Sequence, residues 1–413
     1  MTAKAPAGRP LVVVALFVAA VALATRPAAQ QAQPAQPSPS QRLPPVAGPL
    51  PGYVPDEVAV RPIEPPARPL PPERESARVT KFSFFAYGDT RSTGPLQPGE
   101  PAPDARGINP RHAAVVDAML STAQRLAPTD FPVRFVVSSG DAILYGPNGT
   151  MWNVAYTPVV ERITREAGLP FFYAPGNHDM TARPVGDPDR EHGLRNTLSA
   201  MSKLMPPNGS PRRLDGYATF SFGYGNAFFL LLDSNIATDA RQLDWTAAQL
   251  DGLDRRRYKH VFAVFHHPPF DSGQHGGDLL EPASAAIRAV YLPLFHKHHV
   301  RMTITGHDHL MDHFVERYED GGRKYRMDHL VSGGGGAPTY IYTGEPDLSL
   351  YLKENAAQNV SIEHLMKPGS TVQANPNHFV IVRVDGDRVS LEVVPAAGLA
   401  SYTPYGKTRI DLN

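Results

Sequence analysis

Aspartate, asparagine and histidine residues follow closely behind five short apolar segments of the sequence. They are Asp89, Asp141, Asn177 with His178, His266 with His267, and His307 with His309. Oxygen and imidazole donors in this mixture suit zinc, manganese, iron and similar ions. One ion needs roughly four to six ligands, so two ions bridged by a carboxylate use the set more economically. Two-metal sites of this kind are suited to the hydrolysis of phosphate esters.

The apolar segments are predicted strands that alternate with predicted helices. Strands are expected over 81–89, 133–138, 170–174, 260–265 and 300–305, with hairpins over 217–232 and 378–394, and helices over 110–126, 151–167, 242–253 and 282–296. This alternation favours βαβ units with buried, largely parallel strands. Ligands bind beyond the carboxyl ends of such strands, so the five polar strand ends are expected to converge.

Each of the five motifs is weak alone, but their order is specific. A strand that ends in Gly-Asp, as at Asp141, is more often an ordinary turn. His307 and His309 are alternate residues, which point to the same side of an extended chain. Gly176 and Asn177 favour a tight turn that exposes the next side chains. In this order the set resembles the calcineurin-like metallophosphoesterases, on their purple acid phosphatase-like side, whose pattern is Asp, Gly-Asp, Gly-Asn-His-Asp/Glu, His and Gly-His-x-His. The stretches FSFGYGNAFFLLLDSN, FHHPPFDSGQHG, GHDHLMDHF and LVSGGGGAP also resemble that branch.

The resemblance implies a four-layer α/β/β/α sandwich with the site at one edge. It assigns the metal ligands as follows: Asp141 bridges both ions, Asp89 and His309 bind the first, and Asn177, His266 and His307 bind the second. It also places His178 at the phosphoryl group. His275 resembles a histidine that contacts substrate, with a solvated loop position as the alternative. His267, Asp179, Asp308 and His313 are expected to support the site or the fold.

Two positions depart from the family pattern. Many members have a histidine two residues after the first aspartate, whereas this chain has Arg91. Purple acid phosphatases have a ligating tyrosine three residues after the second aspartate, where this chain has Leu144 followed by Tyr145. Arginine stays protonated and cannot bind a metal, but its planar fork suits phosphate oxygens. Arg91 is therefore expected to contact the phosphoryl group or the Asp89 and Asp141 carboxylates, with a surface salt bridge as the alternative.

These features predict an acid phosphatase-like metallophosphoesterase in which a hydroxide bridging two iron, manganese or zinc ions attacks phosphorus. His178, with Arg91 or His275, would hold the phosphoryl oxygens. The expected substrate is a small-molecule phosphate ester, and insertions near 181–215 and 340–376 are expected to shape its pocket. A phosphate- or partner-binding module with impaired catalysis is the alternative, because the first ion would have only three protein ligands.

Composition excludes several other classes of site. The 413-residue chain has no cysteine, so disulfides, thiolate catalysis and thiolate metal sites are excluded. Lysine plus arginine and aspartate plus glutamate both number 40. This balance gives no electrostatic reason to expect nucleic acid as a partner.

The N-terminal region predicts export. Basic residues precede an apolar run over 11–24 and a small-residue site, so residues 1–26 are typical of a secretory signal peptide. An uncleaved membrane anchor is the alternative. Residues 27–78 are rich in proline, alanine and glutamine and are predicted to be a disordered linker, which leaves 79–413 as the folded domain. The protein is therefore expected to be periplasmic or secreted.

Overall fold

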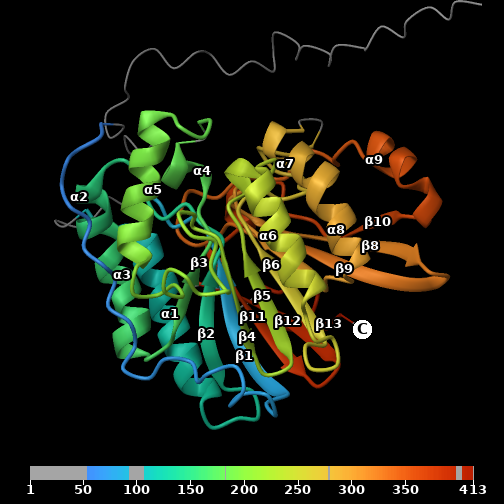
Figure 1. The fold of residues 1–413 in the computed structure, drawn as a ribbon, viewed down its shortest axis with the longest axis horizontal. Coiled ribbons are helices and arrows are strands. Elements are labelled where there is room, and N and C mark those ends of the chain that lie inside the picture. The colour runs from blue at the N-terminus through green and yellow to red at the C-terminus, as the bar shows by residue number, and fades with distance from the viewer. Residues whose placement is uncertain (1–53, 93–106, 182, 278–279, 397–401, 413) are drawn as a thin grey trace, which may run out of the picture. The chain divides into compact units, whose positions relative to one another are not determined.

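Two β-sheets organise the described part of the chain (Figure 1). The computed structural model describes residues 54–92, 107–181, 183–277, 280–396 and 402–412. The first sheet has the order β13-β12-β11-β1-β2-β3, with strands β1 (Lys81–Tyr87), β2 (Val133–Ser138), β3 (Phe171–Tyr173), β11 (His378–Asp385), β12 (Arg388–Pro395) and β13 (Arg409–Asp411). The second has the order β10-β8-β9-β7-β6-β5-β4, with strands β4 (Phe220–Tyr224), β5 (Ala227–Leu231), β6 (His260–Val264), β7 (Met302–Thr305), β8 (Met311–Asp320), β9 (Arg323–Ser332) and β10 (Ser361–Met366).

Each sheet contains a run of parallel strands. β1, β2 and β3 are parallel in the first sheet, and β5, β6, β7 and β9 are parallel in the second. The carboxyl ends of parallel neighbours lie at the same edge of a sheet, so each run gathers its strand ends at one edge.

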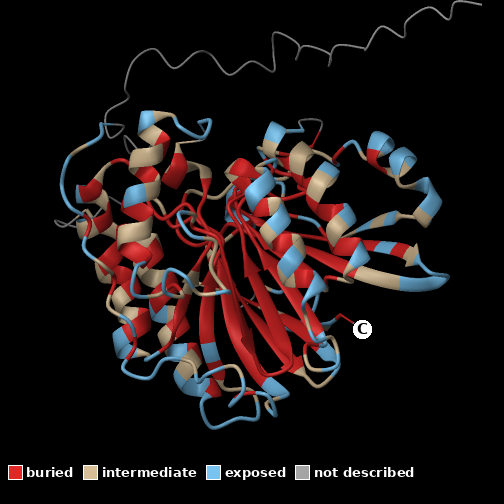
Figure 2. Ribbon diagram, viewed as in Figure 1, coloured by how far each residue is buried: buried red, intermediate tan, exposed pale blue. Residues whose placement is uncertain are grey.

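An aromatic layer joins the two sheets face to face. Phe84 and Phe135 of the first sheet contact Phe229 of the second with ring centroids 5.1 Å apart, and Phe84 also contacts Phe262 at 5.3 Å. All four rings are fully buried, and Figure 2 shows that burial extends along the strands. Alternate strand residues point to opposite faces, so the neighbouring Phe85 lies on the other side of β1.

Helices cover the outer faces of both sheets (Figure 1). They are α1 (Pro110–Leu126), α2 (Gly149–Met151), α3 (Thr157–Glu161), α4 (Asn177–Met180), α5 (Pro188–Met201), α6 (Ala240–Asp251), α7 (Pro282–Ala286), α8 (Leu292–Lys297) and α9 (Ser349–Glu354). Buried residues of α1 and α3 belong to the core cluster of the first sheet, and buried residues of α6 and α8 to a second cluster behind β5 and β6. The expected four-layer α/β/β/α sandwich is therefore confirmed.

The segment expected to be an insertion near 181–215 contains helix α5. The side chain of Asp187 accepts a hydrogen bond from Asp189 N–H, and Pro188 occupies the first turn. Few apolar residues mark the buried face. Instead, Arg190 is buried on it and forms an ion pair of 2.8 Å with the equally buried Asp233. A buried face held by a charged pair gives no hydrophobic periodicity, so the sequence pattern does not reveal this helix.

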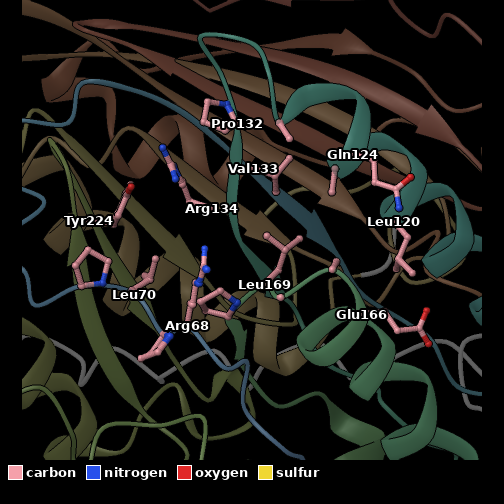
Figure 3. A pocket seen from close by; sticks show the side chains of 17 residues that line it. Arg68, Leu70, Leu120, Gln124, Pro132, Val133, Arg134, Glu166, Leu169 and Tyr224 are labelled. Carbon is pink, nitrogen blue, oxygen red and sulfur yellow. The ribbon is translucent and has the colours of Figure 1, made fainter.

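Residues 54–78 correct the predicted extent of the disordered linker. Ile63 is fully buried and its N–H donates to Ala200 O at 2.9 Å. The Glu73 carboxylate accepts hydrogen bonds from Arg212 and, at 2.6 Å, from the Tyr258 hydroxyl. Leu70 also lines a cavity of about 600 Å³ at the amino ends of β2 and β3 (Figure 3). Proline blocks regular hydrogen-bond ladders but not side-chain packing, so this stretch is folded without helix or strand.

The signal segment at 1–26 and most of the predicted linker lie outside the described residues. Among the residues that are described, the structure contains no helix with the length and apolar character needed to cross a bilayer.

Candidate metal centre

The predicted site residues lie just beyond the carboxyl ends of parallel strands from both sheets. Asp89 follows β1, Asp141 follows β2, and Asn177 opens α4 after β3. His266 follows β6, and His307 with His309 follows β7. The first three strands belong to one sheet and the other two to its partner. The site therefore forms where the strand ends of the two packed sheets meet.

Three of these residues have left-handed backbone conformations that hold their side chains in the site. The φ angles of Asp89, Asp141 and His307 are 61°, 54° and 72°. Such angles are uncommon for non-glycine residues and cluster at functional sites. Hydrogen bonds secure them: Asp89 N–H donates to Gly140 O at 2.9 Å, and His307 N–H donates to the Asp89 carboxylate at 3.0 Å.

Two glycines make room for the carboxylates. A Cβ added at Gly306 would lie 2.1 Å from Asp89 Oδ2, and one at Gly176 would lie 2.1 Å from Asp141 Oδ1. No side chain fits at either distance. Gly306 therefore lets the Asp89 carboxylate approach the backbone, and Gly176 does the same for the Asp141 carboxylate.

The donor atoms assigned to the second metal converge closely. His266 Nε2 lies 2.8 Å from Asn177 Oδ1 and 3.1 Å from His307 Nδ1, and His307 Nδ1 lies 3.1 Å from Asn177 Oδ1. Asp141 Oδ1 is 3.5 Å from His266 Nε2. Three donor atoms from separate strand ends thus lie within 3.1 Å of one another, with Asp141 beside His266, as ligands of a single ion do.

In both His266 and His307, the ring nitrogen that points away from the cluster carries the proton. The nitrogen that points into the cluster therefore keeps a free lone pair. A carbonyl can only accept, so His266 Nδ1–H donates to Ser139 O at 2.9 Å. In the same way His307 Nε2–H donates to the Glu281 carboxylate at 2.8 Å. Burial also lowers the pKa of His266 and of His307, which favours neutral rings. Metal-binding histidines are held by this kind of outer hydrogen bond, so the residues present fit a metal ion.

The residues assigned to the first metal are also brought together, but Arg91 lies among them. His309 Nε2 is 3.6 Å from Asp89 Oδ1, and its Nδ1–H donates to Pro338 O at 2.7 Å. Arg91 Nε lies 3.5 Å from Asp141 Oδ2, and Arg91 Nη2 lies 3.4 Å from His309 Nε2. Its contact with the Asp141 carboxylate is one of the two that the sequence predicted.

The two carboxylates carry opposite pKa shifts. Burial raises the pKa of Asp89 well above its usual range, and the neighbouring Asp141 raises it further. Burial alone would also raise the pKa of Asp141, but His266, His178 and Arg91 together lower it to about 2. Two carboxylates buried side by side require positive charge nearby.

The predicted substrate-contacting histidines lie around the same cluster. His178 N–H donates to Asp141 Oδ1 at 3.0 Å, and His178 Nε2 is 3.9 Å from Asp141 Oδ2. His275 packs on His307 with ring centroids 4.1 Å apart, and its Nδ1 is 2.8 Å from Glu281 Oε1. Burial alone would lower the pKa of His275, but the hydrogen bond with Glu281 and the charge of Asp308 raise it.

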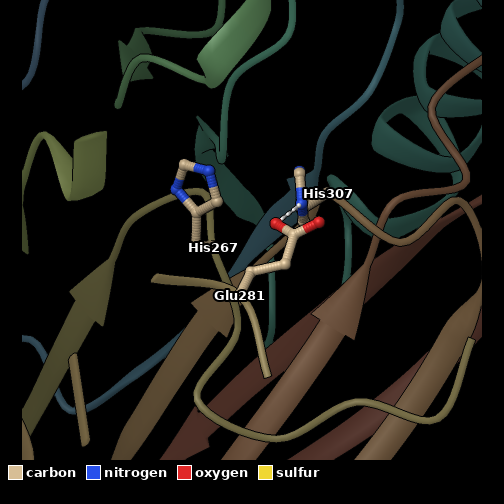
Figure 4. A group of neighbouring side chains, drawn as sticks. All are labelled: His267, Glu281 and His307. Atoms are coloured by element: carbon tan, nitrogen blue, oxygen red, sulfur yellow. Dashed lines mark hydrogen bonds and ion pairs between the residues drawn. The ribbon is translucent and has the colours of Figure 1, made fainter. Parts of the chain in front are cut away.

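Sequence reasoning missed two residues of the site, Glu281 and Tyr340. Glu281 accepts a hydrogen bond from His307 through one oxygen (Figure 4) and from His275 through the other. Tyr340 stacks on His309 with ring centroids 4.1 Å apart and donates its N–H to His309 O. Both come from loops outside the five motifs, and no local pattern marks either one.

Two other residues have hydrogen-bond partners outside the converging donors. The Tyr145 hydroxyl donates to Asp189 of α5 at 3.0 Å, and burial together with Asp189 raises the pKa of Tyr145 to about 12. His267 hydrogen-bonds Ser234 through Nδ1 at 2.8 Å. With Glu281 and His307, His267 forms one of two groups of described residues that could hold a metal ion; the other is Asp89, Asp141 and His266.

Comparison with known proteins agrees with this architecture. Residues 113–311 match the family model of calcineurin-like phosphoesterases. No curated protein matches the chain. A purple acid phosphatase from yellow lupin (Lupinus luteus) seeds shares the fold with a TM-score of 0.54 at 14% identity, over 81% of this chain and 54% of that one. The present chain thus matches only about half the length of the lupin enzyme.

Two further structures are similar at lower scores. The anchor protein GAP50 of the Plasmodium inner membrane complex has a TM-score of 0.48 at 14% identity, over 81% of this chain and 89% of that one. A dimetal phosphatase from Danio rerio has a TM-score of 0.47 at 16% identity, over 80% and 98%. Residues 113–311 are thus similar in sequence to the calcineurin-like phosphoesterases, and the chain shares its fold with a purple acid phosphatase.

Proposed function

We propose that this protein hydrolyses small-molecule phosphate esters in a metal-dependent reaction. The observation that carries the proposal is the convergence of Asn177, His266 and His307, with Asp141 beside His266 and the outer nitrogen of both rings already hydrogen-bonded. Preorganisation of this kind holds ligands in place before an ion binds. A metal bound there supplies Lewis-acid polarisation of the phosphoryl group and activates water.

The chain's own residues then position the substrate. His178 is held by its backbone N–H on Asp141, which places its ring beside the metal ligands. His275 Nδ1–H donates to the Glu281 carboxylate, so the opposite edge of the ring can face a substrate oxygen. Arg91 brings a permanent positive charge to the same space. These three side chains would stabilise the negative charge that develops on the phosphoryl oxygens.

The site of action in the cell is also part of the proposal. Export to the periplasm or the outside of the cell is inferred from the signal-like sequence of residues 1–26. Mass measurement of the protein purified from an exporting host would detect cleavage near residue 26. Full-length protein retained inside the cell would argue against export.

The decisive experiment measures metal content together with hydrolysis of a chromogenic monoester and a chromogenic diester. His266→Ala should lower the rate by more than about 100-fold, since loss of an outer-shell partner alone costs 10–100-fold. His192→Ala on α5 is a matched histidine control and should retain the wild-type rate.

A metal-loaded wild-type protein that turns over neither ester would refute the proposal. It would favour the alternative of a phosphate- or partner-binding module with impaired catalysis. The ratio of monoester to diester rates would show which class the pocket prefers.

A further inference from the structure

Arg91 is held rigidly at the edge of the metal centre by its own backbone. Its N–H donates to Asp141 O at 3.2 Å, and its carbonyl accepts a hydrogen bond from Asn109 Nδ2 at 3.2 Å. The side chain is only 12% exposed. The guanidinium is therefore a fixed part of the centre, which excludes the alternative of a solvated surface salt bridge.

The guanidinium lies among the donors that a first metal ion would need. Arg91 Nε is 3.5 Å from Asp141 Oδ2, and Arg91 Nη2 is 3.4 Å from His309 Nε2. His309 Nδ1 is already bound to Pro338 O, so Nε2 is the only ring nitrogen that could ligate an ion. An arginine cannot lose its proton or bind a metal. Asp141 Oδ2 and His309 Nε2 therefore face the permanent positive charge of Arg91 on the side where a first metal ion would bind.

The two metal positions differ in this respect. Around the second position, the described residues in contact with the metal-binding side chains are of two kinds. They are either other metal-binding side chains or groups that hydrogen-bond to those side chains. Around the first, Asp89 and His309 are 3.6 Å apart and the protein supplies a cation rather than another ligand. The first set therefore fits a resident ion poorly.

We infer that Arg91 takes the place of the first metal ion, so that the centre binds one metal ion per chain. The inference rests on the proposed metal-dependent function and concerns how that function is built. The guanidinium neutralises Asp89 and Asp141 in place of an ion. Its Nε–H has no hydrogen-bond acceptor among the described residues. This buried Nε–H faces Asp141 Oδ2 at 3.5 Å, so its charge is directed at the carboxylate.

Metal stoichiometry tests the inference independently of catalysis. Purified protein is saturated with Mn²⁺ or Zn²⁺, freed of excess ion, and analysed for metal per chain by mass spectrometry. The wild type should bind about one equivalent by this inference. Arg91→His, which removes the fixed charge and adds a donor, should bind a second equivalent. Electron paramagnetic resonance of the Mn²⁺ form should show an isolated ion in the wild type and a spin-coupled pair in Arg91→His.

A control separates this effect from a general loss of surface charge. Arg317→Gln removes an exposed arginine that pairs with Glu363 at 2.7 Å and should leave the stoichiometry unchanged. Arg91→Gln shows whether removal of charge alone admits the second ion. Melting curves confirm that each variant is folded.

The outcomes decide between the two proposals. Two equivalents in the wild type would overturn the role of Arg91 and leave the hydrolytic function intact. No gain of metal in either Arg91 variant would also overturn it. One equivalent without ester hydrolysis would support the role of Arg91 and refute the hydrolytic function. No bound metal would refute both.

Discussion

Glu281 should control metal affinity although it is not a predicted ligand. Its two oxygens accept hydrogen bonds of 2.8 Å from His307 Nε2 and His275 Nδ1. Glu281→Gln keeps one acceptor oxygen and replaces the other with an amide NH₂ group. That NH₂ would face a ring N–H, so one hydrogen bond is lost and two donors oppose each other.

The size of the effect can be worked out in two ways. A hydrogen bond to a charged group contributes about 1.5–3 kcal/mol. Removal of an outer-shell partner of a metal ligand costs about 10–100-fold in affinity, which is about 1.4–2.8 kcal/mol. The two estimates agree, so we expect Glu281→Gln to weaken metal binding by roughly 10–100-fold at neutral pH.

A chelator competition titration measures this change directly. Glu363→Gln, a surface carboxylate paired with Arg317, serves as the matched control and should leave affinity unchanged. His275→Ala removes only the second hydrogen bond, so it should lower the catalytic rate while affinity stays close to wild type. Folded Glu281→Gln protein with wild-type affinity would refute the reasoning that Glu281 orients His307.

Three further changes test the fold around the site. Burial alone would raise the pKa of Glu316, but hydrogen bonds from two buried histidines lower it from 4.5 to about 2. Its stabilisation is therefore present above about pH 4.5 and lost as the pH falls towards 2, so Glu316→Gln should flatten the acid limb of the denaturation curve. Gly306→Ala should weaken metal binding in a protein that still folds, because the new Cβ would displace the Asp89 carboxylate that accepts the His307 N–H and holds this ligand in place, and isothermal titration would detect the change. Arg190→Met should lower the free energy of unfolding by about 3–5 kcal/mol in urea titrations, because Asp233 would be left buried without its partner.

The elements that carry the site were predictable because their signals are local. The helix expected over 110–126 has the same bounds in the structure as α1, and the predicted strands overlap β1, β2, β3, β6 and β7. A buried strand that stops on a polar residue is visible in the sequence. The donor set was therefore predictable from residue type and order, even though convergence depends on tertiary structure.

Elements with polar or unusual burial were not predictable in the same way. The buried face of helix α5 carries Arg190, which pairs with Asp233, instead of a row of apolar residues. The long hairpin of β8 and β9 was missed, although Gly321-Gly322 between its strands is a recognised turn signal. The pairing of strands into two separate sheets came from the family resemblance, because periodicity alone does not distinguish one sheet from two.

Glu281 and the role of Arg91 were beyond sequence reasoning for a different reason. Glu281 lies before a short helix with no motif around it, and its hydrogen bond with His307 joins residues 26 positions apart in the sequence. For Arg91, residue type gave two possible contacts, and only distances distinguish a charge beside Asp141 from one at the surface. Chemistry that depends on neighbours distant in sequence needs coordinates.

The position of Arg91 has an energetic consequence for any model with two metal ions. Two unit charges 4 Å apart interact by about 4 kcal/mol at an effective dielectric constant of 20. A divalent ion at that separation from the guanidinium would therefore be repelled by about 8 kcal/mol. The donors Asp89 and His309 would have to offset this repulsion before a first ion could stay bound. Arg91 supplies positive charge to the same carboxylates, and its repulsion of a first ion is the electrostatic basis of the inference that the centre binds one ion.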